Sequence, residues 1–252
     1  KNLENQYLRA KIAYYEGNNI MSDAEFDVLE KELKKLGSKV IEQVGSKRKD
    51  FDFEHPSKML SLSKIQTEII NNIIDYKEEE FAKWYEKRKP LNKINANVML
   101  SATPKFDGSA INIIYKGGKL FQILTRGDGF SGKDITKRLK PYVPNELAFE
   151  NKEDILEIRC EVVINKDLFD KKYKGYKEEG KYANPRNYVA GVLGKDDYNE
   201  EKVSELSIIP LHFILNSEHV SPILYANKFE SIEHIYDFQY TGNISTTIKF
   251  FE

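Results

Sequence analysis

Residues 110–125 read AINIIYKGGKLFQILT, and this stretch contains the clearest β-hairpin signal of the chain. Its two halves, 110–115 and 120–125, are rich in β-branched and aromatic residues, which favour strands. The segment KGGK at 116–119 separates them, and its glycines tolerate the positive φ angles of a tight hairpin turn. The stretch therefore predicts two antiparallel strands.

More strands are predicted on the carboxyl-terminal side of this hairpin. Residues 155–164 and 206–215 are apolar runs of strand length, and helix-forming residues lie between them at 167–179. This order of elements predicts an α+β domain with a largely antiparallel sheet.

The amino-terminal residues 1–36 predict two helices. Ser22 and Glu25 form a capping box at the start of the second helix, and Gly37 ends it. The segment 14–19, which begins with two tyrosines, predicts a polar turn between the helices. The apolar side chains that recur at helical spacing in the second helix are Phe26, Leu29, Leu33 and Leu36.

A third helix is predicted at 67–89, before Pro90. Between the second and third helices, residues 38–57 form a charged connection. We expect a domain boundary there, which separates a helical domain at 1–57 from a second domain at 58–252. The apolar side of the third helix consists of Ile69, Ile70, Ile73, Ile74, Phe81 and Trp84.

The composition is that of an ordinary globular protein. Of 252 residues, 40% are hydrophobic and 31% charged, and the net charge of −1 excludes a generally basic nucleic-acid coat. We find no apolar run long enough to span a membrane and no secretory signal among the first residues. The single cysteine, Cys160, excludes an internal disulfide and a cysteine-based zinc site, and it favours a reducing compartment. The four histidines lack metal-ligand spacing, so no protein metal site is predicted.

A lysine motif, TPKFDG at 103–108, stands between two predicted strands. Gly108 permits close approach of the backbone to a ligand, and Lys105 is placed as a nucleophilic amine facing a phosphate group. A free lysine has a pKa of about 10.4, so such a nucleophile needs desolvation or nearby cations. Alone, the motif is better interpreted as a surface turn before a strand in a lysine-rich chain.

Three more motifs follow, and each contains an arginine although only seven of the 39 basic residues are arginines. TRGDG at 125–129 predicts a flexible glycine loop that presents Arg126 to phosphate. EIRCEV at 157–162 reads as a functional strand or as a half-exposed strand with its polar side chains outward. YANPRN at 182–187 reads as a phosphate-binding element or simply as a turn and helix start.

These ordered motifs, with the capping box and the two tyrosines, resemble the amino-terminal half of NAD-dependent DNA ligases over nearly the whole chain. The resemblance implies a small all-helical domain that binds the nicotinamide mononucleotide part of NAD. It also implies a following, mostly antiparallel nucleotidyltransferase domain of the ATP-grasp-like ligase fold. The later lysine motifs of that family are not found before Glu252, so we expect a fragment, truncated at its carboxyl-terminal end, or a divergent end.

The resemblance implies a role for each motif residue. Lys105 is similar to the lysine that attacks the α-phosphate of NAD and becomes adenylated, and Asp107 completes its motif. Glu161 is similar to the carboxylate that holds the AMP ribose, and Arg126 and Arg186 to arginines near the phosphates.

Two further groups of residues resemble binding positions of the family. Ser61 and Leu62 resemble the segment that lines the adenine pocket, and Thr103 stands where the family usually has a glutamate. The residues that resemble the nicotinamide nucleotide site are Tyr14, Tyr15, Asp23, Phe26 and Asp27.

Other positions depart from the family pattern. Ser63 replaces an aspartate, Tyr15 a histidine and Phe26 a tyrosine. Lys133 replaces an acidic residue, and Gly194 stands where arginine is common.

The resemblance implies an enzyme that uses NAD and Mg²⁺, acts on nicked double-stranded DNA in repair or replication, and works as a monomer. It also implies a cytoplasmic location, in a cell or in the host of a virus. The alternatives are an ATP-dependent polynucleotide ligase or capping guanylyltransferase, against which residues 1–36 argue, and a non-catalytic nucleotide- or DNA-end-binding module on the same fold.

Overall fold

The computed structural model describes residues 2–15, 20–42, 53–60, 68–70, 73–75, 78–88, 100–102, 105–149, 151–175, 182–220 and 240–242. The chain divides into two compact units. The first contains Lys1–Leu60 and Phe106–Glu233, and the second contains Ser61–Lys105 and His234–Glu252. Among the helices of the described ranges, none has the length and apolar character to cross a membrane.

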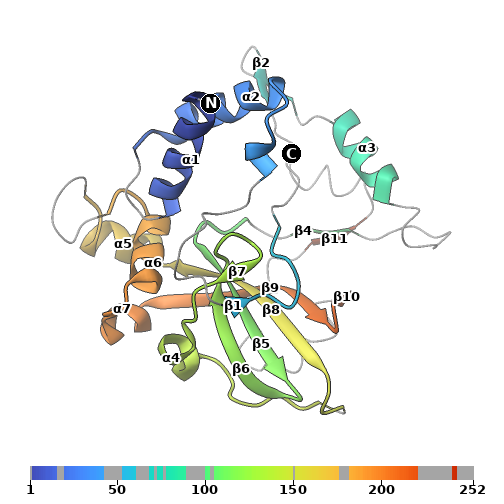
Figure 1. Cartoon of the computed structure of the whole chain (residues 1–252), viewed down its shortest axis with the longest axis vertical. Helices are drawn as coiled ribbons and strands as arrows, with labels where there is room; N and C mark the ends of the chain where they lie inside the picture. The colour runs from blue at the N-terminus through green and yellow to red at the C-terminus, as the bar shows by residue number, and fades with distance from the viewer. Residues whose placement is uncertain are drawn as a thin grey trace. The chain divides into compact units, whose positions relative to one another are not determined.

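A five-stranded antiparallel sheet forms the centre of the first unit (Figure 1). Its long inner strand, β8, lies between β5 and β9, and β6 and β10 lie at the edges. The predicted α+β class with an antiparallel sheet is therefore confirmed. The strands are β5 (Ser109–Lys116), β6 (Lys119–Thr125), β8 (Ile155–Ile164), β9 (Leu206–Leu215) and β10 (Glu218–Val220).

The hairpin predicted at 110–125 is present as β5 and β6. Lys116 pairs with Lys119, and Gly117 and Gly118 make the turn with φ angles of 55° and 82°. Positive φ at both central residues is the geometry of the hairpin turn that matches strand twist, and glycine adopts it without strain. The sequence prediction is confirmed here.

The two faces of this sheet differ in character. Ile111, Ile113 and Ile158 are buried on one face. The register places Asn112 opposite Arg159 and Ile114 opposite Glu157 on the other face. The alternative of outward polar side chains on β8 is wrong for Glu157, which is only 1% exposed, because residues 53–60 cover this part of the face.

Residues 53–60 are joined to the sheet mainly through their backbone. β1 (Phe53–Glu54) pairs with β7 (Ser131–Gly132) in an antiparallel two-stranded sheet. Arg159 then donates hydrogen bonds from its guanidinium to the carbonyls of Ser57 at 3.2 Å and Lys58 at 2.8 Å. A segment far from β8 in the sequence is thus held against it.

Helix α6 (Pro185–Gly194) contacts β8 and β5. Asn184 caps its amino terminus by accepting a hydrogen bond from the Asn187 amide at 2.8 Å, and proline occupies the first turn. The predicted helix start is confirmed. The shorter helices of this unit are α4 (Thr136–Leu139), η3 (Lys140–Tyr142), α5 (Lys166–Lys172) and α7 (Glu200–Ser204).

The two predicted amino-terminal helices are α1 (Asn2–Tyr15) and α2 (Asp23–Lys35), followed by η1 (Lys39–Glu42). The Ser22–Glu25 capping box is present, and Gly37 follows α2 with φ 66°. Tyr7, Leu29 and Leu33 form their small buried core. The turn predicted at 14–19 is wrong for its two tyrosines, which belong to the last turn of α1, and its other residues lie outside the described ranges.

The second unit corrects the helix predicted at 67–89. β2 (Glu68–Ile70) and β3 (Ile73–Asp75) form an antiparallel pair, and of the residues described between 67 and 89 only α3 (Glu78–Arg88) is helical. The register joins Ile69 with Ile74 and Ile70 with Ile73, so the β-branched side chains that suggested a helix face instead occupy strands, which they favour. A second pair joins β4 (Leu100–Ala102) to β11 (Tyr240–Gly242).

Candidate active site

The lysine motif begins after β4. Lys105 lies three residues beyond the end of this strand, and its side chain is exposed. Thr103 lies outside the described residues, so its predicted contact stays a prediction.

Asp107 and Arg186 are brought together from two separate motifs. Arg186, in the first turn of α6, donates from Nε to Asp107 Oδ1 at 2.7 Å, and its terminal NH2 group donates to the same oxygen. The side chains of Asp107 and Arg186 are 69% and 29% exposed, so the pair lies at the surface, where a ligand can reach it. The pair therefore links the lysine motif to the YANPRN motif.

Gly108 and Glu161 form the second link. The Gly108 amide donates to Glu161 Oε1 at 3.1 Å, and a Cβ atom at position 108 would overlap the carbonyl oxygen of Val162. Only glycine permits this approach of the lysine motif to β8. A carboxylate in this position, which only accepts hydrogen bonds, suits a ligand with hydroxyl groups.

Glu161 lies in a partly buried environment that affects its charge. Burial raises the pKa of its carboxyl, and the charge of Asp107 raises it further. The hydrogen bond from Gly108 and the charges of Arg186 and Arg126 lower this pKa in part. Both predicted phosphate-binding arginines therefore act electrostatically on the predicted ribose-binding carboxylate.

The Arg126 loop is a closed turn, and the flexibility predicted for it stays a prediction. Gly127 and Gly129 adopt φ angles of 56° and 87°. Asp128 Oδ1 accepts hydrogen bonds from the amides of Phe130 at 2.9 Å and Ser131 at 2.8 Å. The glycines are needed for the sharp turn, and the aspartate fixes it.

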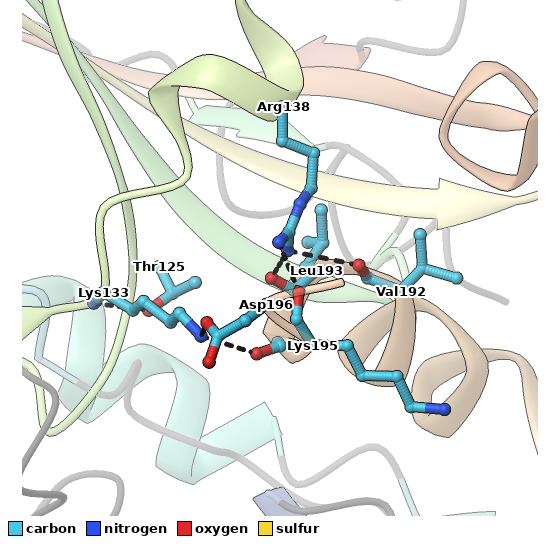
Figure 2. Close-up of polar contacts among 8 residues, drawn as sticks. Thr125, Lys133, Arg138, Val192, Leu193, Lys195 and Asp196 are labelled. Atoms are coloured by element: carbon cyan, nitrogen blue, oxygen red, sulfur yellow. Dashed lines mark hydrogen bonds and ion pairs between the residues drawn. The ribbon is translucent and has the colours of Figure 1, made fainter. Parts of the chain in front are cut away.

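The sequence analysis did not identify Arg138, a buried residue of α4 whose guanidinium contacts the carboxyl-terminal end of α6 (Figure 2). Arg138 is 6% exposed, and its guanidinium donates to the carbonyls of Val192, at 3.2 Å, Leu193 and Lys195. These carbonyls belong to the end of the helix, where no intrahelical partner is available. Arg138 thus fixes the helix that carries Arg186, and the scarcity of arginine in this lysine-rich chain was the one signal for it.

Two of the positions that depart from the family pattern are neighbours in space. Lys133 donates from Nζ to the carbonyl of Gly194 at 2.8 Å and forms an ion pair with Asp196 (Figure 2). A Cβ atom at position 194 would meet no atom within 4 Å. A lysine from the loop after β7 therefore places a positive charge beside the position at which arginine is common.

The comparisons with known proteins agree with this geometry. Residues 47–246 match the family model of the NAD-dependent DNA ligase adenylation domain. The chain belongs to this family. Residues 1–53 also match the model of the PGRL1 N-terminal domain.

Several relatives of the adenylation domain are DNA ligases. The DNA ligase of Rickettsia canadensis is 34% identical over 211 residues, which are 78% of this chain and 29% of that protein. That of Endomicrobium trichonymphae is 34% identical over 212 residues, which are 76% of this chain and 29% of that protein. That of Sulfurimonas denitrificans is 41% identical over 120 residues, 47% of this chain and 18% of that protein. The chain thus spans less than a third of the length of these relatives.

Some of the remaining predicted binding residues of this adenylation domain lie in α1 and α2, and the others lie outside the described residues. Tyr14 and Tyr15 lie in α1 and Asp23 in α2, but their side chains are outside the described part. Phe26 stacks on Tyr7 with a centroid distance of 4.9 Å, and Asp27 is exposed one turn after the start of α2. Ser61 and Leu62 lie outside the described ranges.

Proposed function

We propose that this chain transfers AMP from NAD to Lys105 as the first step of DNA ligation. Two motifs distant in sequence meet the lysine motif at adjacent residues, Asp107 with Arg186 and Gly108 with Glu161, and this meeting carries the proposal. Membership of the NAD-dependent DNA ligase adenylation family supports it.

In the proposed step, Lys105 Nζ forms a bond to the α-phosphorus of NAD. The bond that breaks joins this phosphorus to the oxygen that bridges to nicotinamide mononucleotide, which leaves with its own phosphate. Only a neutral amine can attack, so the lysine gives up its proton to solvent. Such a transfer depends mainly on positioning and on stabilisation of charge.

The other site residues are proposed to hold the nucleotide. Glu161 accepts hydrogen bonds from ribose hydroxyls, and Arg126 and Arg186 stabilise charge on the phosphates. Ser61, Leu62 and Thr103 are proposed to face the adenine. With these roles, we propose that the antiparallel sheet and the segment 53–60 belong to a nucleotidyltransferase domain of the ATP-grasp-like ligase fold.

Residues 1–57 are proposed to bind the leaving group and residues 58–252 to hold AMP. Aromatic rings suit the flat, cationic nicotinamide ring, and carboxylates suit its amide, ribose and charge. The residues proposed for this task are Tyr14, Tyr15, Asp23, Phe26 and Asp27.

Mg²⁺ is proposed as a cofactor on the phosphates. The described residues contain no group of three or more His, Cys, Asp and Glu side chains suited to a metal ion, whereas Mg²⁺ at phosphates commonly needs only one or two carboxylates. When bound, the ion would neutralise phosphate charge. We also propose that the protein acts on nicked double-stranded DNA as a cytoplasmic monomer.

The proposal is tested by the intact mass of the purified chain after incubation with NAD and Mg²⁺. We expect the mass of one added AMP, located on Lys105 by peptide mapping, and no addition in Lys105→Ala or Lys105→Arg. Guanidinium stays protonated, so the arginine variant keeps the charge but loses the nucleophile. Wild-type protein that binds NAD without gaining AMP would instead support the non-catalytic binding module.

A further inference from the structure

Three polar side chains are buried between the sheet and the segment 53–60. Asn112 on β5 is 0% exposed, Glu157 on β8 1% and His55 8%. Burying a polar group costs free energy unless the group is hydrogen-bonded, so apolar residues would fill this space at a lower cost in free energy. Their presence here requires another explanation than packing.

The three side chains form a chain of contacts that ends on Arg126. Asn112 Nδ2 donates to Glu157 Oε2 at 2.6 Å and lies 3.4 Å from His55 Nδ1. His55 Nε2 lies 3.2 Å from the backbone carbonyl oxygen of Arg126. The contacts therefore connect the centre of the sheet to the loop that carries a proposed phosphate-binding residue.

Chemistry fixes the protons along this chain. The carboxylate of Glu157 accepts, so the amide of Asn112 presents its NH2 group to it, and the second hydrogen of that group points to His55 Nδ1. The imidazole nitrogen Nδ1 then accepts, which leaves the proton on Nε2. That proton is donated to the carbonyl of Arg126.

Arg126 is thereby held at both ends of its backbone unit and along its side chain. Its amide donates to the Ala110 carbonyl at 3.0 Å, and its Nε donates to the Met59 carbonyl at 3.1 Å. Its carbonyl oxygen accepts a hydrogen bond from the Gly129 amide at 3.0 Å and lies 3.2 Å from His55 Nε2. Gly132 lies beside the imidazole, because a Cβ at that position would approach His55 Nε2 to 3.4 Å.

We propose that His55, oriented by Asn112 and Glu157, is a positioning residue that sets the place of Arg126 in the active site. The proposal rests on the proposed function, because Arg126 must act on the nucleotide for its position to affect AMP transfer. His55 itself does not touch the nucleotide in this proposal.

The charges around His55 agree with a neutral imidazole. Burial lowers its pKa, and Arg159 lowers it further, whereas the carbonyl of Arg126 and the charges of Glu157 and Asp128 raise it. A second proton, on Nδ1, would oppose the Asn112 NH2 group and break the chain.

The test is a double-mutant cycle of His55→Leu and Arg126→Ala, read as the single-turnover rate of Lys105 adenylation at saturating NAD. A small displacement of a positioned group can cost about a hundredfold, so we expect His55→Leu to slow the wild-type reaction by about ten- to a hundredfold. In the Arg126→Ala background we expect less than about a twofold further loss, because coupled residues are not additive. His55→Gln, whose amide can donate to the same carbonyl, is expected to recover most of the rate.

Equal losses in both backgrounds, or an unchanged rate in His55→Leu, would overturn the positioning role. If His55→Leu is not folded at the assay temperature by circular dichroism, the same cycle is run with Asn112→Ser and judged by the same criteria. Wild-type protein is measured in parallel. A wild type that gains no AMP refutes the proposed function, whereas an additive cycle on an active wild type refutes only the role of His55.

Discussion

Arg186 and Asp107 lie 79 residues apart in the sequence, yet the guanidinium of Arg186 donates two hydrogen bonds to Oδ1 of Asp107. The contact ties the first turn of α6 to the residue two positions after Lys105. It holds the carboxylate of the lysine motif in place, whereas the side chain of Lys105 is exposed.

Arg186→Lys is expected to slow AMP transfer to Lys105 by about tenfold or more, because an ammonium group cannot reproduce the planar donor pair of a guanidinium. The rate is measured by single-turnover labelling with adenine-labelled NAD. Arg9→Lys, at an exposed position of α1, is the matched control and should keep the wild-type rate. Equal rates for the two variants would remove Arg186 from the site.

Glu161 is expected to make nucleotide binding depend on pH. A ribose hydroxyl donates a stronger hydrogen bond to an ionised carboxylate than to a neutral carboxyl, and burial raises the pKa of this carboxyl above the ordinary glutamate value of about 4.3. AMP affinity should therefore fall as the pH is lowered, and the fall should begin at a higher pH than an ordinary glutamate would cause. Calorimetric titration with AMP across this range measures it.

The control for this effect is a pair of variants. Glu161→Gln should bind AMP more weakly and lose the acid dependence, whereas Glu153→Gln, at an exposed position, should keep both. A Glu161→Gln protein that retains the acid dependence would show that another group causes it.

Arg138→Met is expected to lower the free energy of unfolding by about 2 kcal/mol or more. The substitution leaves carbonyls at the end of α6 without their charged donor, and a hydrogen bond to a charged group contributes about 1.5–3 kcal/mol. Urea unfolding followed by circular dichroism gives the value. Lys137→Met, one residue earlier and exposed, should change it little, and similar losses in both would contradict a specific role for Arg138.

Asp27→Ala is expected to affect the reaction with NAD but not the binding of AMP. The variant should react with NAD at least about tenfold more slowly, because alignment of the leaving group lowers the barrier, while AMP affinity stays at the wild-type value. Glu32→Ala, also exposed on α2, is the control. ATP should be a poor donor for the wild type, and labelling of Lys105 that is faster with ATP than with NAD would overturn the nicotinamide assignment.

Local signals in the sequence predicted much of the fold. Two adjacent glycines determine the β5–β6 turn, and the Ser22–Glu25 capping box determines the start of α2, because both depend on neighbouring residues only. The helix predicted at 67–89 failed because its isoleucines satisfy helical spacing and cross-strand pairing equally well, and the pairing partner decides between them.

The sequence predicted the site residues that belong to recognisable motifs. It did not predict which polar side chains are buried, because their burial depends on segments distant in the sequence. The contacts of Asp107 with Arg186 and of Gly108 with Glu161 join residues that the motifs had singled out. The burial of Glu157 could not be read from β8, because the segment that covers it is about a hundred residues away in the chain.

The segment 53–60 has a consequence for how this part of the protein changes in evolution. Arg126 and Arg159 bind the carbonyls of Ser57, Lys58 and Met59, and every amino acid offers the same carbonyl. Substitutions at positions 57 and 58 therefore leave these anchors intact, whereas loss of either arginine removes an anchor that acts beside the β1–β7 pairing. We expect side chains at these two positions to drift among relatives while the backbone keeps its course, so that similarity of sequence there understates similarity of structure.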